Sequence, residues 1–349
     1  MTKWILRVTL LSLIAAVPLQ GQQPPAQLVR FLRQGIGLDS AQMVLVERGD
    51  AVVKVLDTRD RRDVAVFGII AADVSREVYV GQVRDFQTSL RTPTRSHLGI
   101  FSTPARAADV EAVTISSRDV ADMKDCKPGD CVVKLPATDM RRIHDETNWS
   151  ADDVQAQLSA YARRRLVEYV TDYRTRGDAA LAIYDDRGNL NVHASEAFAG
   201  LLAESPYVYQ NVPSLGRYFS AYPRDTLAGV TEVLFWSQDV LPRLRPVLSV
   251  THQVVYTPPE LPGVTLVAAK QIYANHYFEA ALDLTCVVDR AGPPSPPGGR
   301  TGSYLLVLRR YRFDNMPSGG LLNIRGRAVG ALRDQLLADL RRQKTAAER

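Results

Sequence analysis

The 349-residue chain is poor in the residues that most often carry chemistry. It has three cysteines, three tryptophans and five histidines, and the histidines are scattered between His97 and His276. It contains no His-Glu-x-x-His zinc motif, no Gly-x-Ser-x-Gly nucleophile elbow, no phosphate-binding P-loop and no complete Gly-x-Gly-x-x-Gly. The sequence therefore predicts no metal site and no cofactor, and it supplies no motif for a catalytic residue.

Excess charge and long apolar runs are also scarce. The 43 basic and 38 acidic residues leave a net charge of only +5, and no basic cluster stands out, so nucleic acid is not an expected partner. The hydrophobic share of 46% and the charged share of 23% are those of an ordinary globular protein. The chain therefore has enough apolar residues for a sizeable core and no pattern typical of several membrane spans.

The one long apolar run lies near the start of the chain. Lys3 and Arg7 precede a stretch from Val8 to Leu19 that is about 12 residues long, shorter than the roughly 20 residues that span a bilayer. We interpret residues 1–21 as a signal peptide, with an uncleaved N-terminal membrane anchor as the alternative. Together with the Arg-rich and Ala-rich composition, this predicts a bacterial protein that is periplasmic or secreted.

The cysteines fit an oxidising compartment. Cys126 and Cys131 flank the turn signal Pro128-Gly129, which brings their side chains within reach of each other. A disulfide clip is the favoured interpretation, ahead of two free thiols and of a redox or metal site. Cys286 lies in a strand-like run and is expected to be a buried free thiol.

Periodicity predicts an α+β fold. A helical leader over residues 22–49 precedes two strands that form a hairpin, and a long helix follows the capping segment 150–153. Alternation then predicts three antiparallel strand runs before a final amphipathic helix. The expected hairpin strands are 51–56 and 64–71, and the long helix is 154–176. The later strand runs are 247–256, 265–288 and 304–313, of which 265–288 is long enough to contain a bulge or bend, and the final helix is 322–344.

Two segments carry a resemblance to a known superfamily. The segment from Val66 to Phe86 is similar to the opening strand, bend and first helix of the START-like helix-grip proteins, also called the polyketide-cyclase or lipid-transport superfamily. The block from Val247 to Lys344 resembles their closing strands and last helix. The two segments cover well under half of the chain, and the match rests on element order. It implies a curved antiparallel sheet gripping the C-terminal helix across residues 50–349, an apolar cavity between them, and a mostly helical insertion at about 88–245.

Strand alternation gives a candidate ligand-binding wall. The even-numbered residues of the two long runs are mainly apolar and are predicted to face inward, whereas Ser249, Thr251, Gln271 and Glu279 face outward. The inward set is Leu248, Val250, His252, Val254 and Tyr256, then Lys270, Ile272, Ala274, His276, Phe278, Ala280, Leu282 and Leu284. Loop closure would place His252 opposite Ala269 and Lys270, and Glu279 near Arg312 as an ion pair.

The polar residues on that inner wall have two interpretations. His252, Lys270 and His276, with Tyr256 and Phe278, can form a ligand-binding site for the polar end of an apolar molecule. Alternatively, they bond to carboxylates or carbonyls of the inserted region and hold the core together, since an unpaired buried lysine is costly.

Three functions follow from these observations. The favoured one is an exported binding or carrier protein whose partner is an apolar small molecule or a lipid. The first alternative is a non-enzymatic accessory or structural subunit of a cell-envelope or membrane-bound assembly, with an envelope protein as partner and side chains filling the cavity. The second is a cyclase- or hydrolase-type enzyme in which His252 or His276 acts as a general base.

Overall fold

The computed structural model describes residues 25–188, 190–240, 244–290, 302–314 and 323–349. The expected signal segment 1–21 lies outside these residues. The described part is an α+β protein built on an eight-stranded antiparallel sheet of order β1-β2-β10-β9-β8-β7-β6-β3, which does not close on itself. The strands are β1 (Val52–Leu56), β2 (Asp63–Ala72), β3 (Arg95–Ile100), β6 (Thr231–Asp239), β7 (Val247–Tyr256), β8 (Val264–Ala274), β9 (Phe278–Asp289) and β10 (Ser303–Phe313).

The predicted hairpin is confirmed, because β1 and β2 pair antiparallel along their length. The run over 265–288, predicted as one strand with a bulge or bend, is wrong as a single strand. It divides into β8 and β9 at residues 275–277, where Tyr277 takes a left-handed φ of 63°. A tyrosine in that conformation is uncommon, and the sequence offers no glycine or proline to mark the turn. The backbone N–H of Arg245 donates to the Tyr277 hydroxyl at 2.8 Å, which helps to hold the turn.

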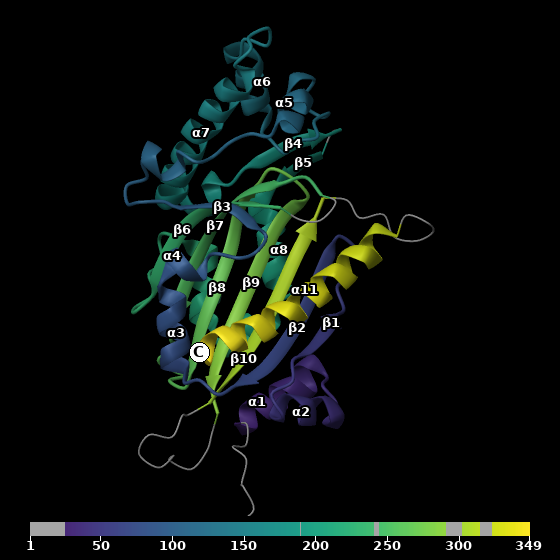
Figure 1. Cartoon of the computed structure of the whole chain (residues 1–349), viewed down its shortest axis with the longest axis vertical. Helices are drawn as coiled ribbons and strands as arrows, with labels where there is room; N and C mark the ends of the chain where they lie inside the picture. Colours follow the sequence, from purple (N-terminus) through teal and green to yellow (C-terminus); the bar gives the residue numbers. More distant parts are fainter. Residues whose placement is uncertain (1–24, 189, 241–243, 291–301, 315–322) are drawn as a thin grey trace, which may run out of the picture.

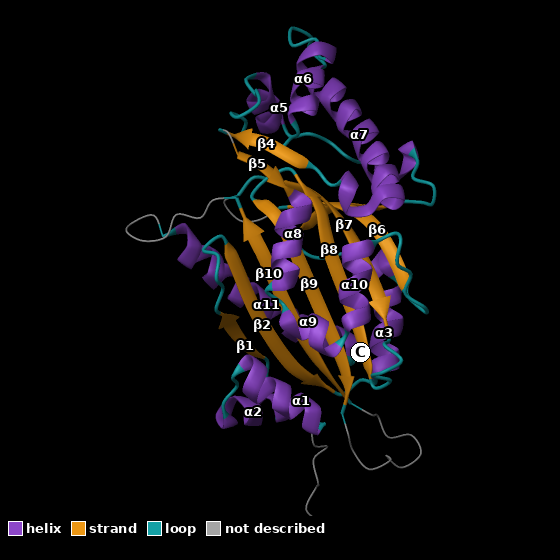
Figure 2. Ribbon diagram, turned by 180° about the vertical axis from the view of Figure 1, so that it is seen from behind, coloured by secondary structure: helices purple, strands orange, loops and turns teal. Residues whose placement is uncertain are grey.

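Helices cover both faces of the sheet (Figures 1 and 2). One face carries α11 (Ile324–Ala347), α3 (Arg76–Arg84) and α4 (Phe86–Ser89). The other carries α8 (Ala194–Ala203), α9 (Pro206–Asn211) and α10 (Pro213–Ala221), with α1 (Ala26–Arg30), the π-helical segment η1 (Phe31–Ile36) and α2 (Ser40–Glu47) beside them. The sheet is therefore the middle layer of three.

The predicted C-terminal helix is confirmed as α11, and it packs closely on β2. Leu336 and Leu340 are fully buried against the strand at Gly68, where an added Cβ would lie 2.7 Å from Leu340 Cδ1. Glycine at this position lets the helix approach the sheet backbone. Leu305 and Val307 of β10 complete this side of the core.

A second group of elements stands at one end of the sheet (Figure 1). It comprises α5 (Ser117–Lys124), α6 (Ala137–Glu146), α7 (Val154–Arg176) and the small hairpin of β4 (Ile183–Arg187) and β5 (Leu190–His193). We call these elements the upper unit. The helix predicted after residues 150–153 is confirmed as α7. The stretch 88–245 also supplies β3 and β6, which are strands of the main sheet.

Gly177 ends α7 for a steric reason. Its φ is 58°, and a Cβ at this position would lie 1.7 Å from the carbonyl oxygen of Tyr222. Only glycine fits where the chain leaves the helix and passes this close to another backbone.

The predicted disulfide between Cys126 and Cys131 is present, and Cys286 is a free cysteine. Cys286 is half-buried and not fully enclosed. Among the described helices, none combines the length and the apolar character needed to cross a bilayer.

The predicted pairing of Glu279 with Arg312 is wrong. Arg62, from the turn between β1 and β2, binds Glu279 at 3.0 Å, while Arg312 binds Asp63 at 2.7 Å. Strand alternation could not reveal this, because Arg62 reaches Glu279 from a turn that was not placed beside β9.

Candidate functional site

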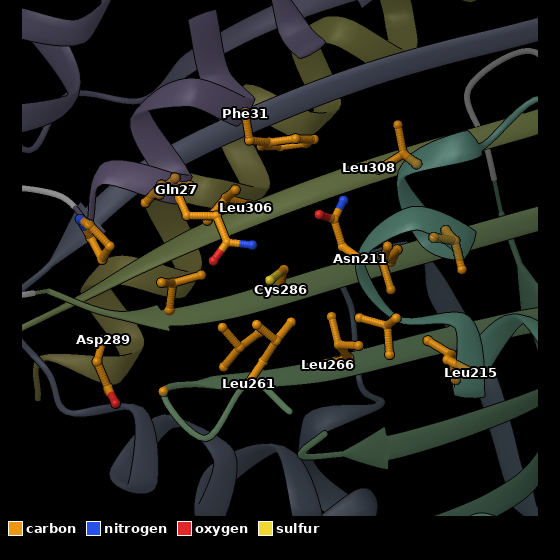
Figure 3. Close-up of a pocket in the computed structure, with 18 of the residues that line it drawn as sticks. Gln27, Phe31, Asn211, Leu215, Leu261, Leu266, Cys286, Asp289, Leu306 and Leu308 are labelled. Atoms are coloured by element: carbon orange, nitrogen blue, oxygen red, sulfur yellow. The ribbon is translucent and has the colours of Figure 1, made fainter. Parts of the chain in front are cut away.

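An apolar pocket of about 450 Å³ lies on the face of the sheet opposite α11 (Figure 3). Its floor is formed by side chains of β8, β9 and β10, and its walls by the N-terminal helices, by α9 and α10, and by the loop between β7 and β8. The floor consists of Leu266, Leu284, Cys286, Val288, Leu306 and Leu308, and the apolar walls include Leu28, Phe31, Ile36, Val208, Val212, Leu215 and Leu261.

Alternation along the strands makes the floor. Every floor residue is even-numbered, so each points to the same side of its strand as its cross-strand neighbours. The register pairs Leu266 with Cys286, and Cys286 with Leu306, giving a continuous apolar row across three strands. The row lacks large aromatic side chains, which leaves space between the sheet and the helices above it.

The N-terminal helices close one side of the pocket. Leu28 and Phe31 share a face of this segment, and the ring of Phe31 lies 6.2 Å from that of Phe67 at an edge-on angle of 70°. Edge-to-face aromatic pairs of this kind stabilise packing beyond the area that they bury. The segment thereby becomes a wall of the pocket.

The polar residues of the pocket lie around its apolar floor. Gln27 and Asn211 reach toward the pocket from the two helical walls, whereas the carboxylate of Asp289 points away from the floor (Figure 3). Glu260, in the loop between β7 and β8, is the other acid of the lining. The Ser214 hydroxyl donates to Glu260 Oε1 at 3.4 Å. Burial raises the pKa of the Cys286 thiol to about 12, so at neutral pH this part of the floor is uncharged. The arrangement suits an apolar molecule with one polar end.

His252 and Lys270 lie on the predicted face but outside this pocket. The structure pairs them across β7 and β8, which confirms their predicted register, and neither exposes any surface. His252 Nδ1 lies 3.0 Å from the Tyr173 hydroxyl, and its Nε2 lies 3.2 Å from a carboxylate oxygen of Glu232. Burial lowers the pKa of His252, although the contact with Glu232 opposes that shift.

Lys270 is held by the inserted region as well. Its ammonium group contacts the carboxylate of Asp178 and donates to the backbone oxygen of Phe219 at 3.1 Å. It also lies 4.3 Å from the centre of the Phe198 ring. Burial lowers the pKa of Lys270, and Asp178 opposes that shift.

The other three predicted site residues lie apart from one another. His276 is in the turn between β8 and β9, with its Nε2 3.0 Å from Asp119 Oδ1. Tyr256 ends β7, and its hydroxyl lies 3.3 Å from the Ser214 hydroxyl. Phe278 packs against the rings of Tyr311 and Phe313, which are β10 residues. Of the five predicted residues, the structure brings only His252 and Lys270 together as cross-strand partners.

Two further pockets lie outside the apolar one. A pocket of about 470 Å³ lies between α6, α7 and β4 of the upper unit and Leu248 and Tyr273 of the main sheet. Arg165, which lines it, binds Asp139 at 2.8 Å. A polar pocket of about 510 Å³ lies beside the disulfide and is lined by His276, Arg245 and Asp186 among others. Although burial alone would raise the pKa of Asp119, its contacts with His276, Ser116 and Arg245 lower it overall. No group of three or more His, Cys, Asp or Glu side chains suited to a metal ion occurs in the described part of the chain.

No protein-family model and no curated protein matches this chain. Functional evidence therefore comes from the geometry of the pockets and from the residues that line them.

The predicted inner set of even-numbered residues contributes to the apolar pocket, but these residues face away from α11, whereas the resemblance implied a cavity on the α11 side of the sheet. Leu284 belongs to the predicted inner set and lines the apolar pocket, whereas Lys270 lies four residues beyond Leu266 on β8. The useful signal was the continuation of the even-numbered apolar row through Cys286 and Val288. The walls at residues 25–36 and 206–215 could not be assigned, because nothing local in those segments shows which part of the sheet they cover.

Proposed function

We propose that this protein is an exported binding or carrier protein for an apolar small molecule. The apolar pocket opposite α11 is the observation that carries the proposal. Its volume of about 450 Å³ falls within the range of roughly 300–1,000 Å³ that is usual for small-molecule sites. It also has the usual composition of such sites, a mainly apolar wall with a few polar groups at defined places.

The expected source of affinity is the hydrophobic effect. A ligand with an alkyl chain would remove its own surface and that of Leu284, Leu306 and Leu308 from water. Each buried methylene contributes about 0.8 kcal/mol to binding before the entropic cost of association is subtracted.

The START-like resemblance is a separate hypothesis. It implies a cavity between the sheet and the C-terminal helix, whereas the apolar pocket lies on the other face of the sheet. On the α11 side, Leu336 and Leu340 approach Gly68 closely. The binding proposal therefore stands on the pocket alone.

Export forms part of the same proposal. It is supported by the predicted signal segment 1–21 and by the disulfide between Cys126 and Cys131, since disulfides persist in oxidising compartments. The expected location is the periplasm or the medium.

A neutral fluorescent probe, N-phenyl-1-naphthylamine, tests the pocket directly. We expect saturable binding by the wild type and a loss of at least tenfold in affinity for Leu284→Trp and Leu306→Trp, because the indole ring would occupy the space. Leu190→Trp is the matched control, since Leu190 is 68% exposed and distant in sequence from every lining residue. Equal probe binding by all four proteins would contradict the proposal.

Native mass spectrometry of protein purified from its own envelope fraction distinguishes the carrier function from the accessory-subunit alternative. A bound small molecule that is absent from Leu284→Trp supports the carrier. A stable protein partner together with an empty pocket supports the accessory-subunit alternative.

One observation favours proton-transfer chemistry as a second candidate function. His276 lines the polar pocket and contacts Asp119, so a histidine and a carboxylate meet at a hollow. The test is hydrolysis of small chromogenic esters by wild type and by His276→Gln. Activity that disappears in the variant while its melting temperature is unchanged supports this candidate, and absence of activity in the wild type contradicts it.

A further inference from the structure

The polar side chains that line the apolar pocket are acids and amides. Its lining contains two carboxylates, Glu260 and Asp289, and two amides, Gln27 and Asn211. Among the described residues that line it there is no lysine, arginine or histidine. A pocket for fatty acids or phospholipids would be expected to hold at least one such cation near its polar end, because carboxylates and phosphates are recognised most strongly by charged donors.

The two acids differ in their surroundings. Asp289 ends β9, and its carboxylate points away from the pocket floor to bind Arg76 at 3.2 Å. Glu260 belongs to the loop between β7 and β8, is exposed, and accepts a hydrogen bond from the Ser214 hydroxyl at 3.4 Å. The carboxylate without an ion-pair partner among the described residues that line the pocket is therefore that of Glu260, at its rim.

The described cation that contacts Asp289 is Arg76, and it already has other hydrogen-bond partners. Arg76 binds Asp289 at 3.2 Å with its Nε, and its two terminal nitrogens contact Thr265 at 2.9 Å and Glu77 at 2.7 Å. Because Arg76 reaches Asp289 from α3, on the α11 side of the sheet, it is not part of the pocket lining. An anionic ligand would have to break these contacts to gain an ion pair.

We infer that the ligand is an apolar molecule whose polar end donates hydrogen bonds, as an alcohol or an amine does, and that lipids ending in a carboxylate or a phosphate are rejected. The inference rests on the proposed binding function. Carboxylate and amide oxygens accept hydrogen bonds from a hydroxyl or an ammonium group. An anionic end would instead lie near the carboxylate of Glu260 and would gain no donor of opposite charge from the described lining residues.

A series with one chain length tests this inference. Dodecanol, dodecylamine and dodecanoate are each used, below their micellar concentrations, to displace N-phenyl-1-naphthylamine at pH 7.5 and low salt. We expect the alcohol and the amine to displace the probe at concentrations at least tenfold lower than dodecanoate. Added salt should narrow the gap between amine and acid, because the pocket end is partly exposed and its charges are screened.

One variant and one control test whether Glu260 causes the preference for a neutral or cationic end. Glu260→Gln leaves the Arg76–Asp289 ion pair intact, so a gain of at least threefold for dodecanoate and a loss for dodecylamine would show that Glu260 sets the preference. Asp334→Asn on α11 is the matched control, since its side chain is 67% exposed on the other face of the sheet. It should change none of the three affinities.

The outcomes separate the inference from the proposed function. If dodecanoate displaces the probe as well as dodecanol does, the pocket is a ligand site and the inference about its polar end is overturned. If the wild type binds neither the probe nor any of the three compounds, the proposed function itself fails.

Discussion

The buried His252 of β7 and Lys270 of β8 are both paired with groups from the inserted region. Lys270 has no exposed surface, whereas the side chain of its partner Asp178 is 26% exposed. A lone charge left in a dry interior costs several kcal/mol, but one that water can reach costs less. The two partners of this ion pair are therefore expected to respond differently to substitution.

Asp178→Ala should destabilise the protein more than Lys270→Met does. The first change leaves an ammonium group buried without a carboxylate and should lower the free energy of unfolding by about 3–5 kcal/mol. The second leaves a carboxylate that water can hydrate, and methionine fills the space of the lysine chain. Urea denaturation measures both, and the reverse order would contradict the account. Neither variant should change probe binding in the apolar pocket by more than twofold.

His252 should make stability depend on pH just below neutrality. Its pKa in the folded protein is lowered by burial, below an unfolded value of about 6.5. As the pH falls through 6.5, the unfolded chain takes up a proton that the folded chain resists, so the free energy of unfolding falls. The carboxylate of Glu232, whose pKa is lowered chiefly by the hydrogen bond with His252, adds a loss in the same direction at lower pH.

Urea denaturation of wild type and His252→Gln between pH 7.5 and 5 isolates this effect. The wild type should lose stability across that window, and the variant should lose less. Parallel curves for the two proteins would show that His252 does not titrate differently in the folded and unfolded states.

At the scale of elements, the packing of α11 on β2 depends on the missing side chain of Gly68. An added Cβ would lie 2.7 Å from Leu340 Cδ1 and 3.0 Å from Leu336 Cδ2. Both leucines are fully buried, so they have little room to move. The close approach of α11 to β2 therefore requires glycine at position 68.

Gly68→Val should lower the free energy of unfolding by about 1–3 kcal/mol through overpacking. Gly81→Ala is the matched control, because Gly81 lies within α3 and an added Cβ meets nothing within 4 Å. That change should raise stability by about 0.5–1 kcal/mol, since glycine is a poor helix former. Thermal melts followed by circular dichroism compare the two, and a neutral Gly68→Val would show that α11 can shift without cost.

At the scale of the whole molecule, Lys134 links the upper unit to the main sheet. Its ammonium group lies 2.6 Å from Asp314, which follows β10, and 3.8 Å from Asp186 of β4. It also lies 4.2 Å from the centre of the Tyr184 ring. Burial raises the pKa of Asp186, and Lys134 opposes that shift, so the lysine favours the charged form of its partner.

Lys134→Ala should loosen the upper unit while the sheet stays folded. Without the buried ammonium group, Asp186 and Asp314 would keep only Arg187 as a common cation, and that side chain is 40% exposed. Hydrogen exchange should therefore quicken in α5, α6 and α7 and change little in β2 and β10. Lys127→Ala is the control, since that side chain is 72% exposed. Uniform acceleration through the chain would contradict a local role.

The sequence predicted the features that depend on neighbouring residues. The hairpin of β1 and β2, the bounds of α7, the disulfide and the pairing of His252 with Lys270 all follow from periodicity or turn signals over a few residues. The turn at Tyr277 was missed because its left-handed conformation is held by Arg245, more than thirty residues away. The pocket was misplaced because its walls come from residues 25–36 and 206–215, whose contacts with the sheet are long-range.

Strand β10 contacts α11 on one face and lines the apolar pocket on the other. Leu305 and Val307 lie beneath α11, while Leu306 and Leu308 line the apolar pocket. Residues that support the helix and residues that meet a ligand therefore alternate along one strand. Under the proposed binding function, substitutions at the even positions would change ligand preference while the odd positions keep the helix in place. A single inserted residue would exchange the two roles along the rest of the strand, so lineages should vary β10 by substitution and not by length.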